Sequence, residues 1–266
     1  MPRIKRSPAE QSLDEGAGPE FLEALARGLR VIEAFGRDRR GLTLSDVARL
    51  VDMPRASVRR ILATLVRLDY AEVDDRLFRL SPRILTLAGA YLSSNAVSDI
   101  VQPALERLSD DLGEACSAAV LDGAEVVMIA HASPNRMLPV SAQVGFRLPA
   151  LSSSLGRVLI GALGDKQMDA LLSREKVPKL TASTVRDTVE LRRAIVKARA
   201  DGYSLVDQEA EPGFRSISVP LKRRDGRIIA ALNVGAHTER VPLAAMRKAF
   251  LPRLRALADS LMPQLI

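Results

Sequence analysis

The sequence TLSDVARLVDMPRASVRRILATLVRLDYAEV, residues 43–73, decides the fold of the N-terminal part of the chain. Thr43 and Asp46 form a T-x-x-D capping box, which predicts a short helix that runs to about Val51. After a brief break, Pro54 suits the first turn of a second helix, in which apolar residues recur at helical spacing. The stretch therefore predicts two consecutive helices joined by a tight turn.

Patterns on either side of this helix pair complete the outline of a winged helix. Apolar residues at helical spacing predict a first helix over residues 21–35, and Gly36 follows as a C-terminal stop. Residues 70–80, YAEVDDRLFRL, are typical of two short strands around an Asp74-Asp75 turn. Three helices and a hairpin in this order favour a winged helix-turn-helix, a fold that presents one helix to the DNA major groove.

Beyond the winged helix the pattern changes to mixed helices and strands. Ser81-Pro82 starts a helix that runs to about Leu92 and ends in the polar stretch 93–95. Asp122-Gly123 lies between two predicted strands, 117–121 and 125–130, and is the strongest hairpin signal in the chain. Further strands are expected near residues 137–144, at 216–221 and at 228–234, and helices at 98–112, 153–163, 166–173, 188–200 and after Pro242.

Together these elements predict an α+β fold with two domains. The chain has 266 residues, and its 47% hydrophobic composition supplies apolar surface for two cores. Strands in two groups separated by helices favour one central antiparallel sheet in the C-terminal domain. The expected boundaries are a disordered N-terminal tail at residues 1–19, the winged helix-turn-helix at 20–80, a linker helix and hinge at 81–97, and the second domain at 98–266.

The composition narrows the compartment and the classes of partner. Lys and Arg outnumber Asp and Glu by 39 to 32, a net charge of +7, which favours a polyanionic partner. The single cysteine, Cys116, excludes an intramolecular disulfide framework and a cysteine-based zinc cluster. No uninterrupted apolar run approaches the length of a membrane span, and the first residues lack a signal peptide's apolar region. We therefore expect a cytoplasmic protein that does not contact the membrane.

The positive charge concentrates on the predicted helix-turn-helix, where residues 37–67 hold eight Arg and three Asp. If the apolar face of the second helix points inward, Arg59 and Arg60 lie on its outer face, and Arg can bind guanine with two donors. The alternative is that these arginines form a merely solvated face; the agreement of helix order, turn and charge favours DNA. The expected DNA-binding residues are Thr43, Ser45, Arg55, Ala56, Ser57, Arg59 and Arg60, with the wing residues Arg76 and Arg79 on phosphates or the minor groove.

The sequence offers few residues that could support catalysis. The chain has two histidines, His131 and His237, and neither neighbours a carboxylate at ligand spacing, so surface or satisfied polar roles are expected for both. The serines 152–154 lack a G-x-S-x-G elbow; a helix cap is their expected role, and hydroxyls at a helix N-terminus also suit an anion. Cys116 reads as a small buried apolar residue. We expect no catalytic residue, no cofactor and no metal site.

Several motifs in order resemble one known family. The stretch 43–73, then FRLSPRILTLAGAYLSS, CSAAVLDGAEVVMIAHA, RLPALSSSLGRVLIGAL and GYSLVDQEAEPGFRSISVPLKRRDGRIIAALNVGAH, together resemble the isocitrate-lyase-regulator (IclR) family over about residues 20–262. The resemblance is closest to the branch containing the PcaR, PcaU and PobR regulators of aromatic-acid catabolism. It implies a GAF-like effector-binding domain, dimerisation through the DNA-binding domain and linker helix, and commonly a tetramer built through the effector domains.

The resemblance also implies positions that contact the effector: Ser153, Ser154, Asp207, Ser216, Ser218, Asn233 and Gly235. Two departures from the family pattern stand out. The acidic stretch reads Val206-Asp207-Gln208-Glu209, and Asn233 and Gly235 replace the usual hydroxyls of the last strand. Serines near strand ends also serve as caps, so a structural role competes at these positions.

The expected effector is a small carboxylic or aromatic acid of the hydroxybenzoate, protocatechuate or ketoadipate class. Ser153 and Ser154 before a helix suit its carboxylate, Arg136 or Arg147 suits a charge-assisted contact, and Met137 or Leu155 suits its apolar part. The expected partners are operator DNA, this acid, further copies of the chain and, for an activator, RNA polymerase. The alternatives are a different metabolite, an enzyme on the GAF-like domain, or an architectural DNA-binding protein with an inert C-terminal domain.

Overall fold

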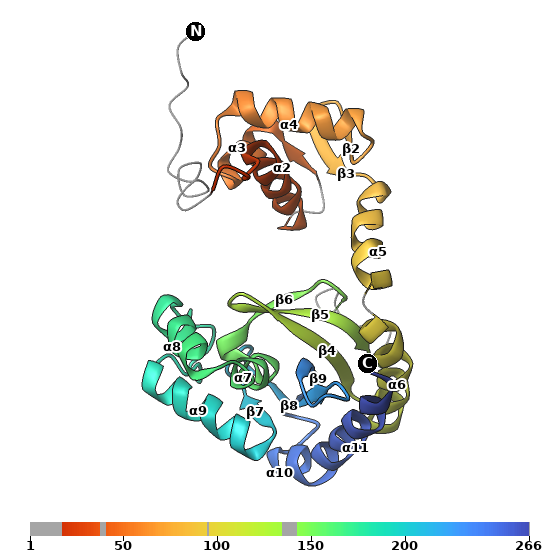
Figure 1. Cartoon of the computed structure of the whole chain (residues 1–266), viewed down its shortest axis with the longest axis vertical. Coiled ribbons are helices and arrows are strands. Elements are labelled where there is room, and N and C mark those ends of the chain that lie inside the picture. Colours follow the sequence, from red (N-terminus) through yellow and green to blue (C-terminus); the bar gives the residue numbers. More distant parts are fainter. Residues whose placement is uncertain (1–17, 38–40, 95, 135–142, 266) are drawn as a thin grey trace. The chain divides into compact units, whose positions relative to one another are not determined.

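The computed structural model of the chain describes residues 18–37, 41–94, 96–134 and 143–265. The chain divides into two compact units, one ending at Tyr91 and one beginning at Leu92 (Figure 1). Each unit has its own hydrophobic core, and the observed mixture of helices with antiparallel sheets confirms the α+β fold class. Within the described parts of the chain, no helix combines the length and apolar character that a membrane crossing requires.

In the described residues before the linker, the N-terminal unit packs three helices with a small sheet. These helices are α2 (Glu23–Ala34), α3 (Leu44–Leu50) and α4 (Arg55–Arg67), and the strands are β1 (Leu42–Thr43), β2 (Ala71–Asp74) and β3 (Leu77–Leu80), in the order β1-β3-β2. Val47, Val58 and Leu62 are fully enclosed between the helices. The expected helix-turn-helix and wing are therefore present.

Two local features explain why this segment folds as its pattern predicts. The Thr43 hydroxyl accepts a bond from the Asp46 N–H, and the Asp46 carboxylate accepts from the Thr43 N–H, which completes the capping box of α3. At the wing turn Asp75 has φ +54°. Aspartate tolerates this left-handed conformation better than most residues, so Asp74-Asp75 can replace the more usual Asp-Gly.

The C-terminal unit is built on a six-stranded antiparallel sheet in the order β6-β5-β4-β9-β8-β7. The strands are β4 (Ala115–Asp122), β5 (Glu125–Ala132), β6 (Arg147–Pro149), β7 (Ser204–Asp207), β8 (Phe214–Lys222) and β9 (Ile228–His237). The hairpin predicted at Asp122-Gly123 is present as β4-β5, the strands expected at 216–221 and 228–234 pair with each other as β8-β9, and pairing of β4 with β9 joins the two halves.

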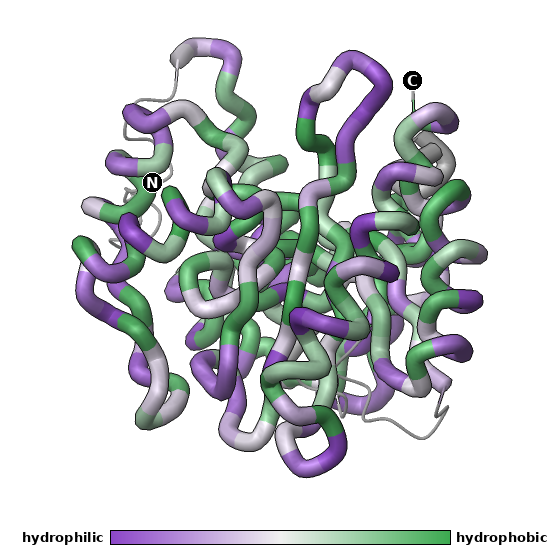
Figure 2. The backbone as a smooth tube through the Cα atoms, turned by 90° about the horizontal axis from the view of Figure 1, so that it is seen from below, coloured by the Kyte–Doolittle hydropathy of each residue, from purple (hydrophilic) through white to green (hydrophobic). Residues whose placement is uncertain are grey.

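Helices cover both faces of this sheet. One core lies between the sheet and helices α6 (Ala96–Leu112) and α11 (Leu251–Leu261), together with the short α10 (Leu243–Ala245) and a π-helical turn (Met246–Phe250). The other core lies between the sheet and helices α7 (Ser154–Gly161), α8 (Asp165–Arg174) and α9 (Thr188–Asp201). Hydropathy changes along these helices, as expected when one side of a helix is buried (Figure 2). Alternate residues of β9 therefore serve different faces: Leu232 and Val234 belong to the first core, whereas Asn233 and Gly235 face the side of α7.

One expected strand lies mostly outside the described residues, and two observed short strands were not expected. Of the strand expected near 137–144, residues 137–142 lie outside the described part of the chain, and Gln143 and Val144 form a bend and a turn; the described strand β6 at 147–149 pairs with β5. The short strands β1 and β7 carry too few residues for a clear alternation, and their patterns predicted no strand. Helix α5 (Leu85–Ser94) ends within the polar stretch that was expected to end it.

Candidate functional site

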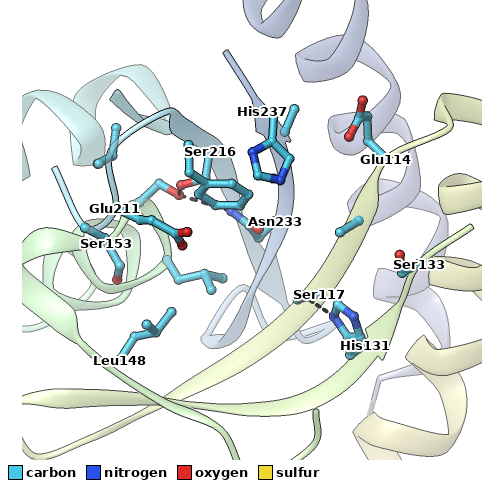
Figure 3. Close-up of a pocket in the computed structure, with 18 of the residues that line it drawn as sticks. Glu114, Ser117, His131, Ser133, Leu148, Ser153, Glu211, Ser216, Asn233 and His237 are labelled. Atoms are coloured by element: carbon cyan, nitrogen blue, oxygen red, sulfur yellow. Dashed lines mark hydrogen bonds between the residues drawn. The ribbon is translucent and has the colours of Figure 1, made fainter. Parts of the chain in front are cut away.

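A cavity of about 360 Å³ opens in the C-terminal unit. Its walls come from the N-terminal end of α7, from β4 and β5, from the loop after β7, and from the adjoining parts of β8 and β9 (Figure 3). Apolar contacts are supplied by Met128, Phe146, Leu148, Leu155 and Phe214. Small-molecule sites are typically cavities of this size with apolar walls and a few convergent polar groups.

The polar part of the cavity begins with three consecutive serines. Ser153 is the N-cap of α7: its Oγ accepts a bond of 3.0 Å from the Gly156 N–H. Gly156 must be glycine for steric reasons, because a Cβ there would stand 2.0 Å from the Ala150 carbonyl oxygen. The Ser152 side chain is fully buried, and its hydroxyl has no hydrogen-bond partner among the described residues. The chain therefore presents hydroxyls at a helix N-terminus, which favours negative charge.

A second polar group links α7 to the sheet. The Ser154 hydroxyl lies 2.7 Å from the Ser216 Oγ and 2.7 Å from the Ser218 Oγ, and it accepts a bond of 3.1 Å from the Asn233 Nδ2. Ser216 and Asn233 line the cavity, whereas Ser218 is fully buried behind them. These four residues, Ser154, Ser216, Ser218 and Asn233, are called the serine–asparagine cluster below.

Both histidines of the chain also line the cavity. His131 Nδ1 lies 2.9 Å from the Ser117 Oγ, and burial lowers the pKa of the His131 imidazole. The ring of His237 meets Phe214 edge-on, with ring centroids 5.8 Å apart. Both histidines point into the same space as the serines in Figure 3. The sequence expectation of surface or satisfied roles missed their position on the cavity wall.

The cavity wall carries an ion pair and a further carboxylate. Glu114 is bonded to Arg240 at 2.8 Å, and burial is the main cause that raises the pKa of the Glu114 carboxyl, although the Arg240 charge opposes it. Glu211 also lines the cavity, on the loop that follows β7. Within the described residues, no group of His, Cys, Asp and Glu is arranged to hold a metal ion.

A buried ion pair holds the loop that carries Glu211. Arg157 of α7 binds Glu209 through two bonds of 2.8 and 2.6 Å, and both side chains are nearly inaccessible to water. Glu209 also accepts a bond of 3.1 Å from the Val185 N–H. One charged pair thus fixes the cavity loop both to α7 and to the segment before α9.

The structure brings together most of the predicted effector residues. Ser153, Ser154, Leu155, Ser216, Asn233 and Gly235 line the cavity. A Cβ on Gly235 would stand 2.4 Å from the Phe214 ring, so a side chain there would displace Phe214. The expected contacts Arg136 and Met137 lie outside the described residues.

Three predicted residues take other positions. Asp207 stands directly opposite Arg215 in the β7-β8 register and binds its guanidinium at 3.0 Å, so its carboxylate is used outside the cavity. Its neighbour Val206 lines the cavity instead, because successive strand residues face opposite sides. Ser218 backs the cavity wall. Arg147 binds Asp122 and Glu125, each at 2.6 Å, which removes it from the cavity.

The predicted recognition helix α4 presents the expected polar face. Val58, Leu62 and Leu65 are buried, and Arg55, Ala56, Arg59 and Arg60 are exposed. Arg55 donates a bond of 2.6 Å to the Ser45 hydroxyl, which links the two helices of the motif. Ser57 is half-buried, and the Thr43 hydroxyl is engaged in the capping box. On the wing, Arg76 is exposed and Arg79 lies 3.8 Å from the Asp74 carboxylate.

A helix-turn-helix unit followed by a unit with a partly polar cavity defines a class of transcription regulators that read DNA and hold a small molecule. Comparison with known proteins gives the particular family. Residues 24–75 match the IclR helix-turn-helix domain, and residues 89–262 match the C-terminal domain of bacterial IclR transcriptional regulators. The chain belongs to the IclR family.

Individual relatives agree with this assignment. The chain is 42% identical to the Pca regulon regulatory protein of Pseudomonas putida, over 99% of this chain and 91% of the relative. A transcriptional regulator of Rhodococcus sp. RHA1 has a similar structure, with a TM-score of 0.79 and 40% identity over 92% of this chain and 98% of that chain. The inducer-binding domain of the Acinetobacter transcription factor PobR, solved as a double mutant with 3-hydroxybenzoic acid, matches with a TM-score of 0.60 and 30% identity over 63% of this chain and 98% of its own.

Proposed function

We propose that this regulator binds a small carboxylic or aromatic acid of the hydroxybenzoate, protocatechuate or ketoadipate class in its C-terminal cavity. The observation that carries the proposal is the convergence of the α7 serines and the serine–asparagine cluster on one cavity with apolar walls. A carboxylate at the start of α7 would meet serine hydroxyls and the favourable dipole of the helix N-terminus. Relatives that control aromatic-acid genes or bind 3-hydroxybenzoate support this class of ligand.

Calorimetry of the full chain tests this proposal. Titration with 4-hydroxybenzoate, protocatechuate and β-ketoadipate should give binding by at least one acid. A ligand at about 100 times its dissociation constant should also raise stability by about 2.7 kcal/mol in thermal unfolding. A sugar and an amine of similar size serve as controls, and binding of these without any acid would contradict the assignment.

We further propose that the exposed face of α4 binds operator DNA. Arg59 or Arg60 reads bases in the major groove, while Arg76 and Arg79 on the wing hold phosphates. The remaining contacts come from Thr43, Ser45, Arg55, Ala56 and Ser57. The effector modulates this binding in the cytoplasm, and a contact with RNA polymerase is part of the function only if the protein activates.

Exposed apolar residues on the linker segment, residues 81–97, support self-association. On α5 the exposed fraction is 66% for Leu85, 49% for Leu87 and 45% for Tyr91. A symmetric partner helix would cover these side chains and place two recognition helices on neighbouring half-sites. Leu85→Glu should lower the sedimenting mass and weaken operator binding together, whereas Leu180→Glu, at an exposed loop position, should change neither. An unchanged oligomer with full DNA binding in Leu85→Glu would refute dimerisation through α5.

A further inference from the structure

The serine–asparagine cluster has a defined hydrogen-bond direction. The two protons on Asn233 Nδ2 are shared among three acceptors, the Ile217 carbonyl oxygen at 3.3 Å, the Ser154 Oγ at 3.1 Å and the Ser218 Oγ at 3.0 Å. A backbone carbonyl can only accept, so the amide nitrogen must face the protein. The Asn233 Oδ1 then remains as an acceptor on the cavity side, without a donor among the described residues.

The same count of donors and acceptors gives the direction in which each serine hydroxyl of the cluster donates its proton. Ser218 is fully buried, and Ser154 Oγ is the acceptor within reach of its proton among the described residues. A buried hydroxyl proton is almost always paired, so Ser218 donates to Ser154. Ser154 accepts from Ser218 and Asn233 and has its own proton left, which goes to Ser216 at 2.7 Å. Ser216 therefore accepts from inside the protein, and its proton is directed to the cavity.

We propose that Ser216 and Asn233 together read one hydroxyl group of the effector. The cavity wall offers a donor, the Ser216 hydroxyl proton, beside an acceptor, the Asn233 Oδ1 (Figure 3). A hydroxyl group both accepts and donates, so it satisfies both atoms. A carboxylate only accepts and would face the Asn233 oxygen unfavourably, and a hydrocarbon edge would leave both atoms unpaired.

This inference rests on the proposed function and deepens it. Among the acids named above, it selects hydroxylated aromatic monocarboxylates and disfavours dicarboxylates at this wall. The carboxylate of such a ligand lies toward Ser153 at the start of α7, on another wall of the same cavity in Figure 3. The two ends of the ligand are thus distinguished by different chemistry.

A ligand series on the full chain tests the selection. Calorimetric dissociation constants are measured for benzoate, 3-hydroxybenzoate, 4-hydroxybenzoate, terephthalate and β-ketoadipate. At least one hydroxybenzoate should bind about tenfold or more tightly than benzoate, because the hydroxyl pairs two groups that benzoate leaves unpaired. Both dicarboxylates should bind more weakly than that hydroxybenzoate.

Two variants test the direction of the bonds. Ser216→Ala removes the donor, so the preference for the hydroxybenzoate over benzoate should fall to within about threefold, with benzoate affinity retained. Ser218 does not line the cavity, but Ser218→Ala removes one donor to Ser154. Ser154 can then accept the Ser216 proton, so the preference for the hydroxybenzoate over benzoate should fall partly. Ser173→Ala, an exposed serine on α8, is the matched control and should keep the wild-type ratio. Retained benzoate binding reports that each variant is folded.

The outcomes separate this inference from the proposed function. Equal affinity of wild type for benzoate and both hydroxybenzoates, or tightest binding of a dicarboxylate, overturns the hydroxyl site and leaves an acid-binding cavity in place. A Ser216→Ala variant that weakens benzoate and hydroxybenzoate alike also overturns it. If none of the acids binds, the proposed function falls and the hydroxyl site falls with it.

Discussion

The two units of this regulator use polar side chains in opposite ways. On the N-terminal unit the arginines of α4 and the wing extend into water, and the helices beneath them are held by a separate apolar core. In the C-terminal unit Ser154, Ser218 and Asn233 are almost inaccessible and bond to one another. For these arginines function and stability are therefore separable, whereas in the second unit the residues that shape the cavity also hold the fold together.

The largest effect is expected from the buried ion pair. Arg157→Ala leaves the Glu209 carboxylate buried without its partner, and such a change costs about 3–5 kcal/mol of unfolding free energy. Arg192→Ala removes a single bond of 2.8 Å to Asp169 between side chains that are about half exposed to water, so its loss of unfolding free energy should be much smaller. Urea unfolding followed by circular dichroism measures both. Equal losses of unfolding free energy in the two variants would contradict the difference between buried and exposed ion pairs.

The second-largest effect on stability is expected where Gly156 packs against the Ala150 backbone at the start of α7. Gly156→Ala forces a methyl group against the Ala150 backbone, so the serine segment must move at a cost of about 1–3 kcal/mol, and acid binding should weaken. Gly161→Ala is the control on the same helix, where the nearest atom to the new Cβ is 3.5 Å away, an ordinary contact. Thermal unfolding with calorimetric titration compares them, and a stable Gly156→Ala variant with intact binding would refute the steric argument.

On the DNA-binding unit, binding should change while stability does not. Replacing whichever of Arg59 and Arg60 reads bases with Ala should cost about 1–3 kcal/mol on the operator and relax preference at one base position. Arg76→Ala should weaken operator and random DNA alike and lower the salt slope by about one. Fluorescence anisotropy at several salt concentrations separates the two patterns. Uniform, salt-dependent losses for all three changes would contradict the division between helix and wing.

The smallest effect concerns pH. Burial lowers the pKa of His131, so the folded chain favours the neutral imidazole. The resulting stability is present above the ordinary histidine pKa of about 6.5 and is lost as the pH falls below that value and through the lowered one. Between about pH 7.5 and about pH 5.5, the melting temperature of wild type should therefore fall more than that of His131→Gln. If the melting temperatures of the two proteins fall equally over this pH range, His131 does not contribute to the pH dependence of stability.

The sequence predicts the N-terminal unit better than the cavity, for a physical reason. The capping box at Thr43 and the spacing of Val58 and Leu62 are local signals, and they determine both the helices and the exposed face of α4. The Asp122-Gly123 turn is equally local and locates β4 and β5. These elements agree with the prediction because their stability is decided within a few residues.

The cavity depends on contacts that the sequence does not display. Ser117 meets Asn233 across the β4-β9 pair, and no local pattern specifies this register. One signal was available: residues 233, 235 and 237 alternate on β9, so the positions assigned to Asn233 and Gly235 also place His237 on the same face. The same alternation places Asp207 on the side opposite Val206, where it meets Arg215.

The pairing of β4 with β9 also orders events while the protein is being made. Two segments far apart in the chain must meet before the cavity exists, and closing so long a loop is a late and slow step in folding. The helix-turn-helix leaves the ribosome first and needs only contacts among near neighbours. In a newly synthesised molecule the DNA-binding unit therefore folds before the cavity forms, so the two functions of the regulator arise one after the other.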